Sequence, residues 1–233
     1  MIIINNQLVT ILISIIAIFT IACQTSPAKK IETPDNSTQN IQVQKSKNTD
    51  KKSIEFVIKK NDNSTARYIV NEQLVKLPSP NDAIGSTKEI EGKIVLSENG
   101  QISSDFNSFF DVNMLSLKSD STRRDNYLKR NSLESNKFPI ASFNITKINN
   151  LPFPAPTNQN LDFEIVGILT IRDISKEITW DVSGKFDGTK LTGLAKTEFN
   201  FGFFEIDIPK VFVVVSVKDL IQLEIEFEAI KVN

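Results

Sequence analysis

Two adjacent pairs of opposite charge are the clearest candidates for acid–base chemistry in this sequence. Arg124 is followed by Asp125, and Arg172 is followed by Asp173. Acid–base catalysis needs two groups that converge on one substrate, whereas adjacent residues of a helix point in different directions. We therefore predict that both pairs are ion pairs at the surface or in turns. The sequence indicates no catalytic residue, and we expect that the protein is not an enzyme.

Other residue types limit the chemistry further. None of the 233 residues is His, which removes the commonest general base and excludes His-dependent triads and zinc sites. Glu224, Glu226 and Glu228 alternate with other residues and so share one face of a strand, whereas calcium ligands usually converge from a loop. We expect this acidic stripe to face water, and we expect no metal site. With 27 basic and 28 acidic residues, no basic surface favours a nucleic-acid partner.

The N-terminal segment has the composition of an export signal. Leu8 to Ala22 is an apolar run without charge, shorter than the roughly 20 residues that span a bilayer. It ends in Thr20-Ile21-Ala22-Cys23, which resembles a bacterial lipobox, where the Cys is lipidated and becomes the mature N-terminus. We predict that residues 1–22 are a signal peptide and that Cys23 carries a lipid. An uncleaved N-terminal anchor is the alternative, because no Lys or Arg precedes the run.

The segment after the apolar run is a predicted linker. Gln24 to Lys52 is rich in polar residues and Pro and has few large apolar residues, so it cannot bury enough surface to fold. We expect residues 23–52 to be a lipidated N-terminus and disordered linker, and residues 53–233 to be the folded domain. Together these segments predict an exported protein of the cell envelope, lipid-anchored at the outer face of a bacterial membrane, in the periplasm or outside the cell.

From Ile54 onward the sequence has the period-2 alternation of β-strands. Ile221 to Ala229 is the clearest strand, and turn signals such as Asp187-Gly188 separate neighbouring strands. One apolar and one polar face for each strand is typical of antiparallel sheets, and eight to ten strands fit a barrel or a sandwich. The short spacing predicts that neighbours in sequence pair in the sheet. Thr122 to Glu134, preceded by residues that can cap it, indicates one helix.

Two stretches resemble a known family in both order and spacing. The first joins a helical Arg-Asp…Leu segment to a Phe-Pro-x-Ala-x-Phe strand, and the second is a Gly-x-Leu-Thr-Ile hairpin. The matching residues are Arg124, Asp125, Leu128, Phe138, Pro139, Ala141, Phe143, Gly167, Leu169, Thr170, Ile171, Ile174 and Ser175. On these residues the chain resembles the YceI-like family of lipid- or polyisoprenoid-binding domains over roughly Leu117 to Ala229. It departs from the family at Asp173, where Gly is usual, although Asp tolerates a left-handed turn conformation.

The resemblance implies a fold and a ligand. The fold of the family is an eight-stranded, antiparallel, lipocalin-like barrel with a helix across it, and its long lumen holds an isoprenoid or fatty-acyl chain. We therefore expect an all-β, lipocalin-like β-barrel with one helix packed across it. The partner expected from the resemblance is an apolar lipid such as an isoprenoid, a quinone or a fatty-acyl ligand. We expect no other cofactor, and the oligomeric state is left open.

The lumen candidates are apolar residues that share the inward faces of the strands. They are Ala141, Phe143, Ile145, Phe163, Ile165, Leu169, Ile171, Ile178, Trp180, Val182, Leu223, Ile225 and Phe227. An eight-stranded barrel either fills itself with side chains or holds one small ligand. Inward-facing Gly92, Gly167 and Gly193 favour an open channel, whereas the 16 Phe residues favour a filled one. A filled barrel would instead be a structural or interaction module whose loops bind a partner.

Two loops are candidates for such contacts. Phe201 to Ile208 is unusually aromatic for a loop. We expect it to cap the mouth of the barrel through Phe201, Phe203 and Phe204, and a partner-binding surface is the alternative. The Pro-rich stretch Leu151 to Pro156 must also be a loop.

Overall fold

Antiparallel strands make up most of the folded part of the chain. The computed structural model describes residues 53–60 and 63–232. The predicted signal peptide (1–22) and the predicted lipidated linker (23–52), with Cys23, lie outside the described residues. Within the described ranges, no helix is long and apolar enough to cross a membrane. The all-β class expected from the alternation is confirmed.

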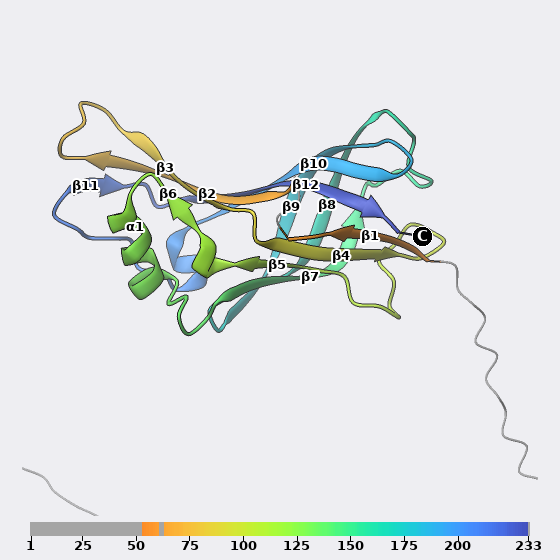
Figure 1. Ribbon diagram of the computed structural model, residues 1–233, viewed down its shortest axis with the longest axis horizontal. Coiled ribbons are helices and arrows are strands. Elements are labelled where there is room, and N and C mark those ends of the chain that lie inside the picture. Colours follow the sequence, from red (N-terminus) through yellow and green to blue (C-terminus); the bar gives the residue numbers. More distant parts are fainter. Residues whose placement is uncertain (1–52, 61–62, 233) are drawn as a thin grey trace, which may run out of the picture. The chain divides into compact units, whose positions relative to one another are not determined.

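Eight antiparallel strands close into a barrel (Figure 1). In spatial order they are β1 (Ile54–Ile58), β4 (Ile90–Leu96), β5 (Phe109–Asn113), β7 (Ile140–Asn149), β8 (Asn160–Ile171), β9 (Ile174–Phe186), β10 (Lys190–Phe199) and β12 (Ile221–Lys231). Pairing between β1 and β12 closes the circle. The predicted antiparallel barrel of eight to ten strands is therefore confirmed. Burial alternates along β8 and β9, so their apolar residues point into the barrel.

Strand β12 is shared between two neighbours. Its residues Ile230 and Lys231 pair with β1, whereas Gln222 to Glu226 pair with β2 (Thr65–Leu74). Strand β2 also pairs with β3 (Asn81–Thr87) and β11 (Val214–Val217), and β3 pairs with the short β6 (Lys118–Ser119). We call these four extra strands the wing, because they leave the barrel on one side (Figure 1). The barrel thus has a closed end, where β1 meets the end of β12, and an open end, where the wing diverges.

A short helical segment lies at the open end beside β6 (Figure 1). Helix α1 (Thr122–Tyr127) continues into the π-helical turn η2 (Leu128–Ser132). The Ser121 hydroxyl accepts a hydrogen bond from the Arg124 backbone N–H and so caps the start of α1. The helix expected over residues 122–134 therefore starts where predicted and ends two residues early. Two 3₁₀ turns, η1 (Met114–Ser116) and η3 (Phe201–Phe204), complete the elements.

The strand order differs in part from the prediction that neighbours in sequence pair in the sheet. Strand β1 pairs with β4, because the β2–β3 hairpin between them belongs to the wing. The alternation does not predict β3 at all. Its inward residues are Ala83, Gly85 and Thr87, which are too small to produce a strong apolar pattern.

Inward-facing glycines make room for aromatic rings rather than leaving a channel. A Cβ atom built on Gly92, Gly167 and Gly193 would lie 2.3, 2.8 and 2.9 Å from the rings of Phe110, Phe143 and Phe227, respectively. Each ring occupies the space that the missing side chain releases, as the close packing of protein interiors requires. The expectation that these glycines favour an open channel is therefore wrong at all three positions.

The acidic stripe of β12 is paired with basic residues of its two neighbours. The pairs are Glu224 with Lys196 and Arg67, Glu226 with Arg67, and Glu228 with Lys190. The Glu224 side chain is only 9% exposed, because Lys196 Nζ at 2.9 Å and the Arg67 guanidinium at 3.4 Å cover it. The expectation that the stripe faces water holds for Glu226, holds only in part for Glu228, whose side chain is 20% exposed, and is wrong for Glu224. The hydrogen bond from Lys196 is the main cause that lowers the pKa of Glu224.

Replacing Glu224 should reduce stability in a pH-dependent way. Since its pKa is lower in the folded chain, the carboxylate stabilises the fold above the unfolded-state pKa, and this contribution is lost as the pH falls through the folded-state pKa. We expect Glu224→Gln to lower the free energy of unfolding by about 1 kcal/mol at about pH 7 and by much less at about pH 3. Urea denaturation measures both values. The exposed Glu226→Gln is the matched control with a smaller effect, and a Glu224→Gln loss that does not change with pH would contradict this account.

Candidate functional site

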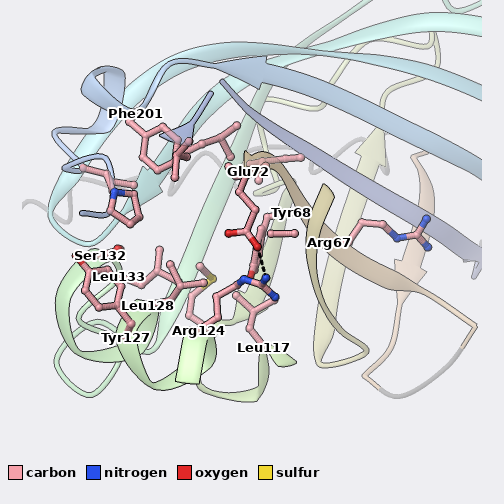
Figure 2. A pocket seen from close by; sticks show the side chains of 18 of the residues that line it. Arg67, Tyr68, Glu72, Leu117, Arg124, Tyr127, Leu128, Ser132, Leu133 and Phe201 are labelled. Carbon is pink, nitrogen blue, oxygen red and sulfur yellow. Dashed lines mark hydrogen bonds and ion pairs between the residues drawn. The ribbon is translucent and has the colours of Figure 1, made fainter. Parts of the chain in front are cut away.

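The described part of the chain encloses a large cavity at the open end of the barrel. Its volume is about 800 Å³, within the range of about 300–1,000 Å³ that is typical of small-molecule sites. Barrel strands form one wall, and the wing, α1, η2 and the segment before β11 form the other (Figure 2). Most of the lining side chains are apolar. Four residues make the floor: Phe110, Phe143, Trp180 and Ile225.

A second cavity, of about 160 Å³, lies beyond this floor toward the closed end. The Pro-rich loop covers it, since Leu151, Phe153 and Pro154 line the cavity. The Phe153 ring packs on Gly100, whose φ of 79° favours glycine. This loop therefore belongs to the hydrophobic core of the closed end. The barrel is nearly filled at one end and hollow at the other.

The lumen candidates from the sequence divide among three locations. Ala141, Phe143, Leu169, Ile171, Trp180, Leu223 and Ile225 line the large cavity, and three of them belong to its floor. Phe163, Ile165 and Phe227 line the small cavity only. Ile145, Ile178 and Val182 are buried in the core and line neither cavity. The candidates nearest the open end are thus the ones that a ligand in the large cavity would contact.

The three Phe residues predicted at the mouth have different surroundings. Phe201 lines the large cavity together with Ile206. Phe204 is fully buried, and its ring centroid lies 4.8 Å from that of Phe199. Phe203 remains 40% exposed. Turn η3 therefore forms part of the cavity wall through Phe201 and is anchored by Phe204.

Most of the residues that form the cavity wall on the side of the wing were not among the lumen residues predicted from the sequence. Tyr68 and Glu72 come from β2, Arg124 and Tyr127 from α1, and Phe212 from the segment before β11. Strand parity identifies inward faces within one sheet, but it does not indicate that a helix and a distant loop complete the same cavity. The alternation of β2 was the available signal, since Tyr68 and Glu72 have the parity of Ala66 and Val70 and therefore share one face of the strand.

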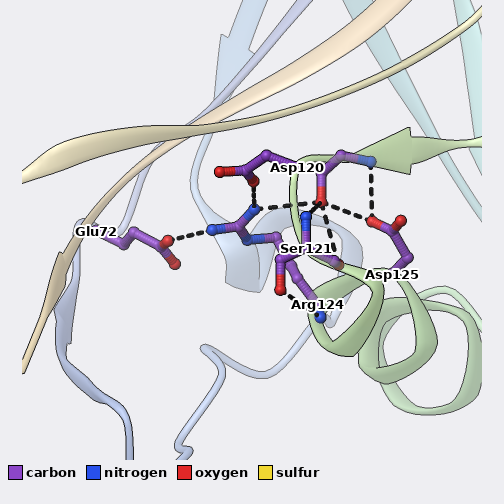
Figure 3. A network of polar contacts seen from close by, with 6 residues as sticks. Glu72, Asp120, Ser121, Arg124 and Asp125 are labelled. Atoms are coloured by element: carbon purple, nitrogen blue, oxygen red, sulfur yellow. Dashed lines mark hydrogen bonds and ion pairs between the residues drawn. The ribbon is translucent and has the colours of Figure 1, made fainter. Parts of the chain in front are cut away.

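A buried ion pair joins the wing to the helix. The Arg124 guanidinium lies between the carboxylates of Glu72 on β2 and Asp120 before α1 (Figure 3). The Arg124 side chain is 17% exposed and the Glu72 side chain 9%, so the pair is largely shielded from water. Burial alone would lower the pKa of Arg124, but hydrogen bonds to Asp120 and Glu72 outweigh it and raise the pKa. Arg124 therefore stays charged, and its charge is compensated.

Arg124 and its sequence neighbour Asp125 both contact the Ser119 hydroxyl but do not pair with each other. Asp125 Oδ1 accepts hydrogen bonds from the backbone N–H and the hydroxyl of Ser119, at 3.0 and 2.6 Å (Figure 3). The prediction that the two residues form a surface ion pair is therefore wrong. Adjacent side chains of a helix diverge, so Arg124 reaches β2 while Asp125 binds the end of β6.

Tyr68 adds a buried hydroxyl to the same wall (Figure 2). Its ring lies across Gly85 of β3, where a Cβ atom would stand 2.2 Å away. The hydroxyl is buried beside Ser119, and among the described residues no hydrogen bond of good geometry satisfies it. Burial raises the pKa of Tyr68 to about 12, so the phenol is uncharged near neutral pH.

Arg172 holds three segments together at the open end. Its guanidinium donates hydrogen bonds to the carbonyl oxygens of Phe204 and Glu205, at 2.8 and 2.7 Å. It also lies 3.5 Å from the carboxylate of Glu134, just after η2. Arg172 has a φ of 58°, so it is the left-handed residue of the β8–β9 turn. The expectations that Asp173 takes this conformation and that Arg172 pairs with Asp173 are therefore wrong.

The arrangement suits the binding of an apolar molecule with a polar end. The floor and most of the walls offer hydrocarbon contacts, while the polar groups gather where the wing meets α1 (Figure 2). Within residues 53–60 and 63–232, no group of three or more His, Cys, Asp or Glu residues is placed to hold a metal ion.

Two solved structures share this fold. The crystal structure of BcnA from Burkholderia cenocepacia has a TM-score of 0.52 and 14% sequence identity, covering 71% of this chain and 94% of its own. A polyisoprenoid binding domain from Saccharophagus degradans, implicated in plant cell wall breakdown, has a TM-score of 0.57 and 7% identity. That match covers 77% of this chain and 99% of the other. At these identities the likeness shows the fold alone.

Sequence comparison identifies the family. None of the curated proteins compared with the chain matches it. The family model described as the YceI-like domain matches residues 62–229, which is most of the chain and nearly all of the described part. The chain therefore belongs to the YceI-like domain family.

Proposed function

We propose that this domain binds a long-chain lipid, an isoprenoid or a fatty-acyl chain, in the large cavity at the open end. The observation that carries the proposal is the cavity, with about 800 Å³ of space and mostly apolar walls. If a methylene group occupies about the volume of a water molecule, about 30 Å³, the cavity has room for about 25 carbon atoms. A longer chain would extend out of the mouth.

Membership in the YceI-like family and likeness to a polyisoprenoid binding domain support an apolar ligand. The alternative, a filled barrel that serves as a scaffold for partner-binding loops, has less support. Its two candidate loops pack inward, since Phe153 lines the small cavity and Phe201 lines the large one. An isoprenoid, a quinone or a fatty-acyl ligand all fit the chemistry of the walls.

The polar groups of the cavity favour binding over catalysis. Arg124 is held by two carboxylates, and the Tyr68 phenol keeps its proton near neutral pH. General acid–base catalysis is most efficient when the pKa of the catalytic group lies near the working pH, and neither group meets that condition. We therefore infer a binding protein rather than an enzyme.

A lipid that moves from a bilayer into this cavity exchanges one apolar environment for another. Each methylene group gains about 0.8 kcal/mol on leaving water, but little of this gain applies to a lipid that comes from a membrane. Affinity must then depend on the shape of the cavity and on contacts at its mouth. We infer a carrier or holder that exchanges its lipid with membranes.

The helical segment covers one side of the cavity and is held near both ends by ion pairs. Tyr127 lines the cavity between them. The Glu72–Arg124 pair fixes the start of the segment to β2, and the Glu134–Arg172 pair fixes its end to the β8–β9 turn. Loosening either pair would free this wall, so these contacts would set how readily a lipid leaves.

We also propose that the protein is exported and tethered to a bacterial membrane through a lipid on Cys23. The support is the sequence alone: an apolar run that ends in Thr-Ile-Ala-Cys, followed by a polar linker. An envelope location would place a lipid-binding barrel close to the membranes that contain its ligand.

Narrowing the large cavity should shorten the lipid that it carries. Ala141 lines the large cavity, and Ala195 lines the small one. We expect native mass spectrometry of the gently purified protein to detect a bound lipid, and Ala141→Phe to shift its chain length downward or abolish binding. Ala195→Phe is the matched control, and its bound lipid should be unchanged.

Repeated ligand-free spectra, with no uptake of a quinone or a polyprenyl phosphate, would overturn the proposed function. Equal effects of Ala141→Phe and Ala195→Phe would mean that the lipid does not occupy the large cavity. Overpacking costs about 1–3 kcal/mol, so thermal unfolding must first establish that both variants are folded.

Breaking the ion pair between β2 and α1 should speed lipid release. Glu72→Gln leaves Arg124 with Asp120, so we expect a loss of about 2 kcal/mol in stability rather than unfolding. The release rate of the bound lipid to acceptor vesicles should rise, because the start of α1 is less firmly held. Glu226→Gln, which removes an exposed carboxylate from the outer face, is the control. A Glu72→Gln protein that is less stable but releases lipid at the original rate would contradict the role of the pair.

The mature N-terminus tests the tether directly. We expect mass spectrometry of the protein from membranes to begin at a lipid-modified Cys23, and Cys23→Ser to abolish both the modification and this new N-terminus. An intact Met1, or an unmodified Cys23 at the N-terminus, would contradict the proposal.

A further inference from the structure

The wing ends in a tip made of two segments, residues 74–80 and 209–217. The Val75 backbone N–H donates a hydrogen bond to the Val213 carbonyl oxygen at 3.1 Å, and Leu74 pairs with Val214. The two segments therefore lie side by side. The C-terminal end of β12 and the start of β1 lie at the opposite, closed end of the barrel (Figure 1).

The tip exposes a group of large apolar side chains. Phe212 is 99% exposed, Val75 and Val215 are each 65% exposed, Val213 is 40% exposed and Leu77 is 37% exposed. Single exposed apolar residues are ordinary on protein surfaces, but a patch gathered on neighbouring segments marks a contact surface. An aromatic side chain held almost wholly in water at such a site indicates a partner that shields it.

The charges of the tip favour a membrane as that partner. The two segments contain Lys76 and Lys210 and no Asp or Glu, although acidic and basic residues are nearly balanced in the whole chain. Apolar side chains flanked by lysines are typical of surfaces that lie in the interface of a bilayer with anionic lipids. A second copy of this tip would instead bring like charges together.

The tip is also continuous with the cavity. Val75, Lys76, Val211 and Phe212 line the large cavity at the same end of the molecule. A tip inserted in the head-group region would therefore bring the mouth of the cavity to the hydrocarbon boundary. A lipid could then pass between bilayer and barrel with little of its chain exposed to water.

We propose that the tip docks on the surface of a phospholipid bilayer that contains anionic lipid, and that lipid enters and leaves the cavity there. The docking of the tip on a bilayer is inferred from the exposed side chains and the lysines. Only the passage of lipid at the tip rests on the proposed lipid-binding function. An experiment can therefore contradict the docking or the lipid binding without contradicting the other.

A local probe on the full-length chain tests the docking. In a Cys23→Ser background, one introduced cysteine carries a polarity-sensitive fluorophore, either at Phe212→Cys or at Phe106→Cys. Phe106 is the matched control, since it is a 52% exposed aromatic residue in the loop between β4 and β5, toward the closed end. Vesicles contain phosphatidylcholine alone or mixed with phosphatidylglycerol.

We expect the Phe212→Cys probe to shift to shorter wavelengths with the anionic vesicles, and the Phe106→Cys probe to stay unchanged. Lys76→Gln together with Lys210→Gln should raise the vesicle concentration at half-maximal shift by about fivefold for each lysine. Attachment through the N-terminal apolar run alone would shift neither probe or both equally, and either result would overturn docking by the tip.

Two further outcomes would also overturn the proposal. A shift at Phe212→Cys without vesicles that grows with protein concentration would mean that a second copy covers the tip. A shift that is already complete without vesicles and independent of concentration would mean that another part of the chain covers it. A chain that inserts its tip but never carries a lipid would overturn the proposed function and leave the docking intact.

Discussion

A strand edge can hydrogen-bond with only one neighbour at each residue, and the rest of this structure depends on how β12 divides its edge. Ile230 and Lys231 pair with β1, while Gln222 to Glu226 pair with β2. The first pairing closes the barrel, and the second sends β2 into the wing. Because the two cannot extend over the same residues, the barrel is closed at one end and open at the other. The large cavity is the space that this divergence leaves, bounded by the wing, the helical segment and the floor.

The floor of the cavity depends on the size of the side chains in the closed half. Inward glycines let the rings of Phe110 and Phe143 lie close to the neighbouring strands. The Phe143 and Trp180 rings then meet edge to face, with centroids 6.1 Å apart. The Trp180 indole N–H is buried without a hydrogen-bond partner in the described part of the chain, and its loss of water is offset by apolar packing around the ring. Rings and glycines together thus make a tightly packed floor, and a ligand occupies one half of the barrel.

Alternation along the strands was enough to predict the all-β class and the inward direction of the apolar residues, because parity is a local property of the backbone. The barrel, rather than a sandwich, was expected only from the resemblance to the YceI-like family. The side of the cavity that the wing forms depends instead on contacts between distant parts of the chain. Arg124 pairs with Glu72, 52 residues away, and Arg172 reaches the carbonyl oxygens of η3 more than 30 residues later. In both cases an adjacent Asp was the partner predicted from the sequence, but in the structure the arginine contacts a group that is distant in the sequence. Nothing in the spacing of the charges indicates those partners. The path of β2 into the wing brings Glu72 to Arg124, and the contact of β9 with η3 brings the Phe204 and Glu205 carbonyls to Arg172.

The positions of these charges bear on which part of a lipid enters the barrel. An unpaired arginine at the position of Arg124 would attract an anionic head group, but the carboxylates of Glu72 and Asp120 compensate its charge. Among the described residues, Lys76 and Lys210 on the tip and Arg123 on α1 are exposed cations without an ion pair, and they lie outside the floor and the wall that the barrel strands form. Since burying an unpaired charge is costly, the favourable arrangement keeps a charged head group near the tip and places the chain in the cavity. This ordering, polar groups outside and hydrocarbon inside, is the one that the lipid already has in a bilayer. Entry at the tip would therefore not require the lipid to turn round.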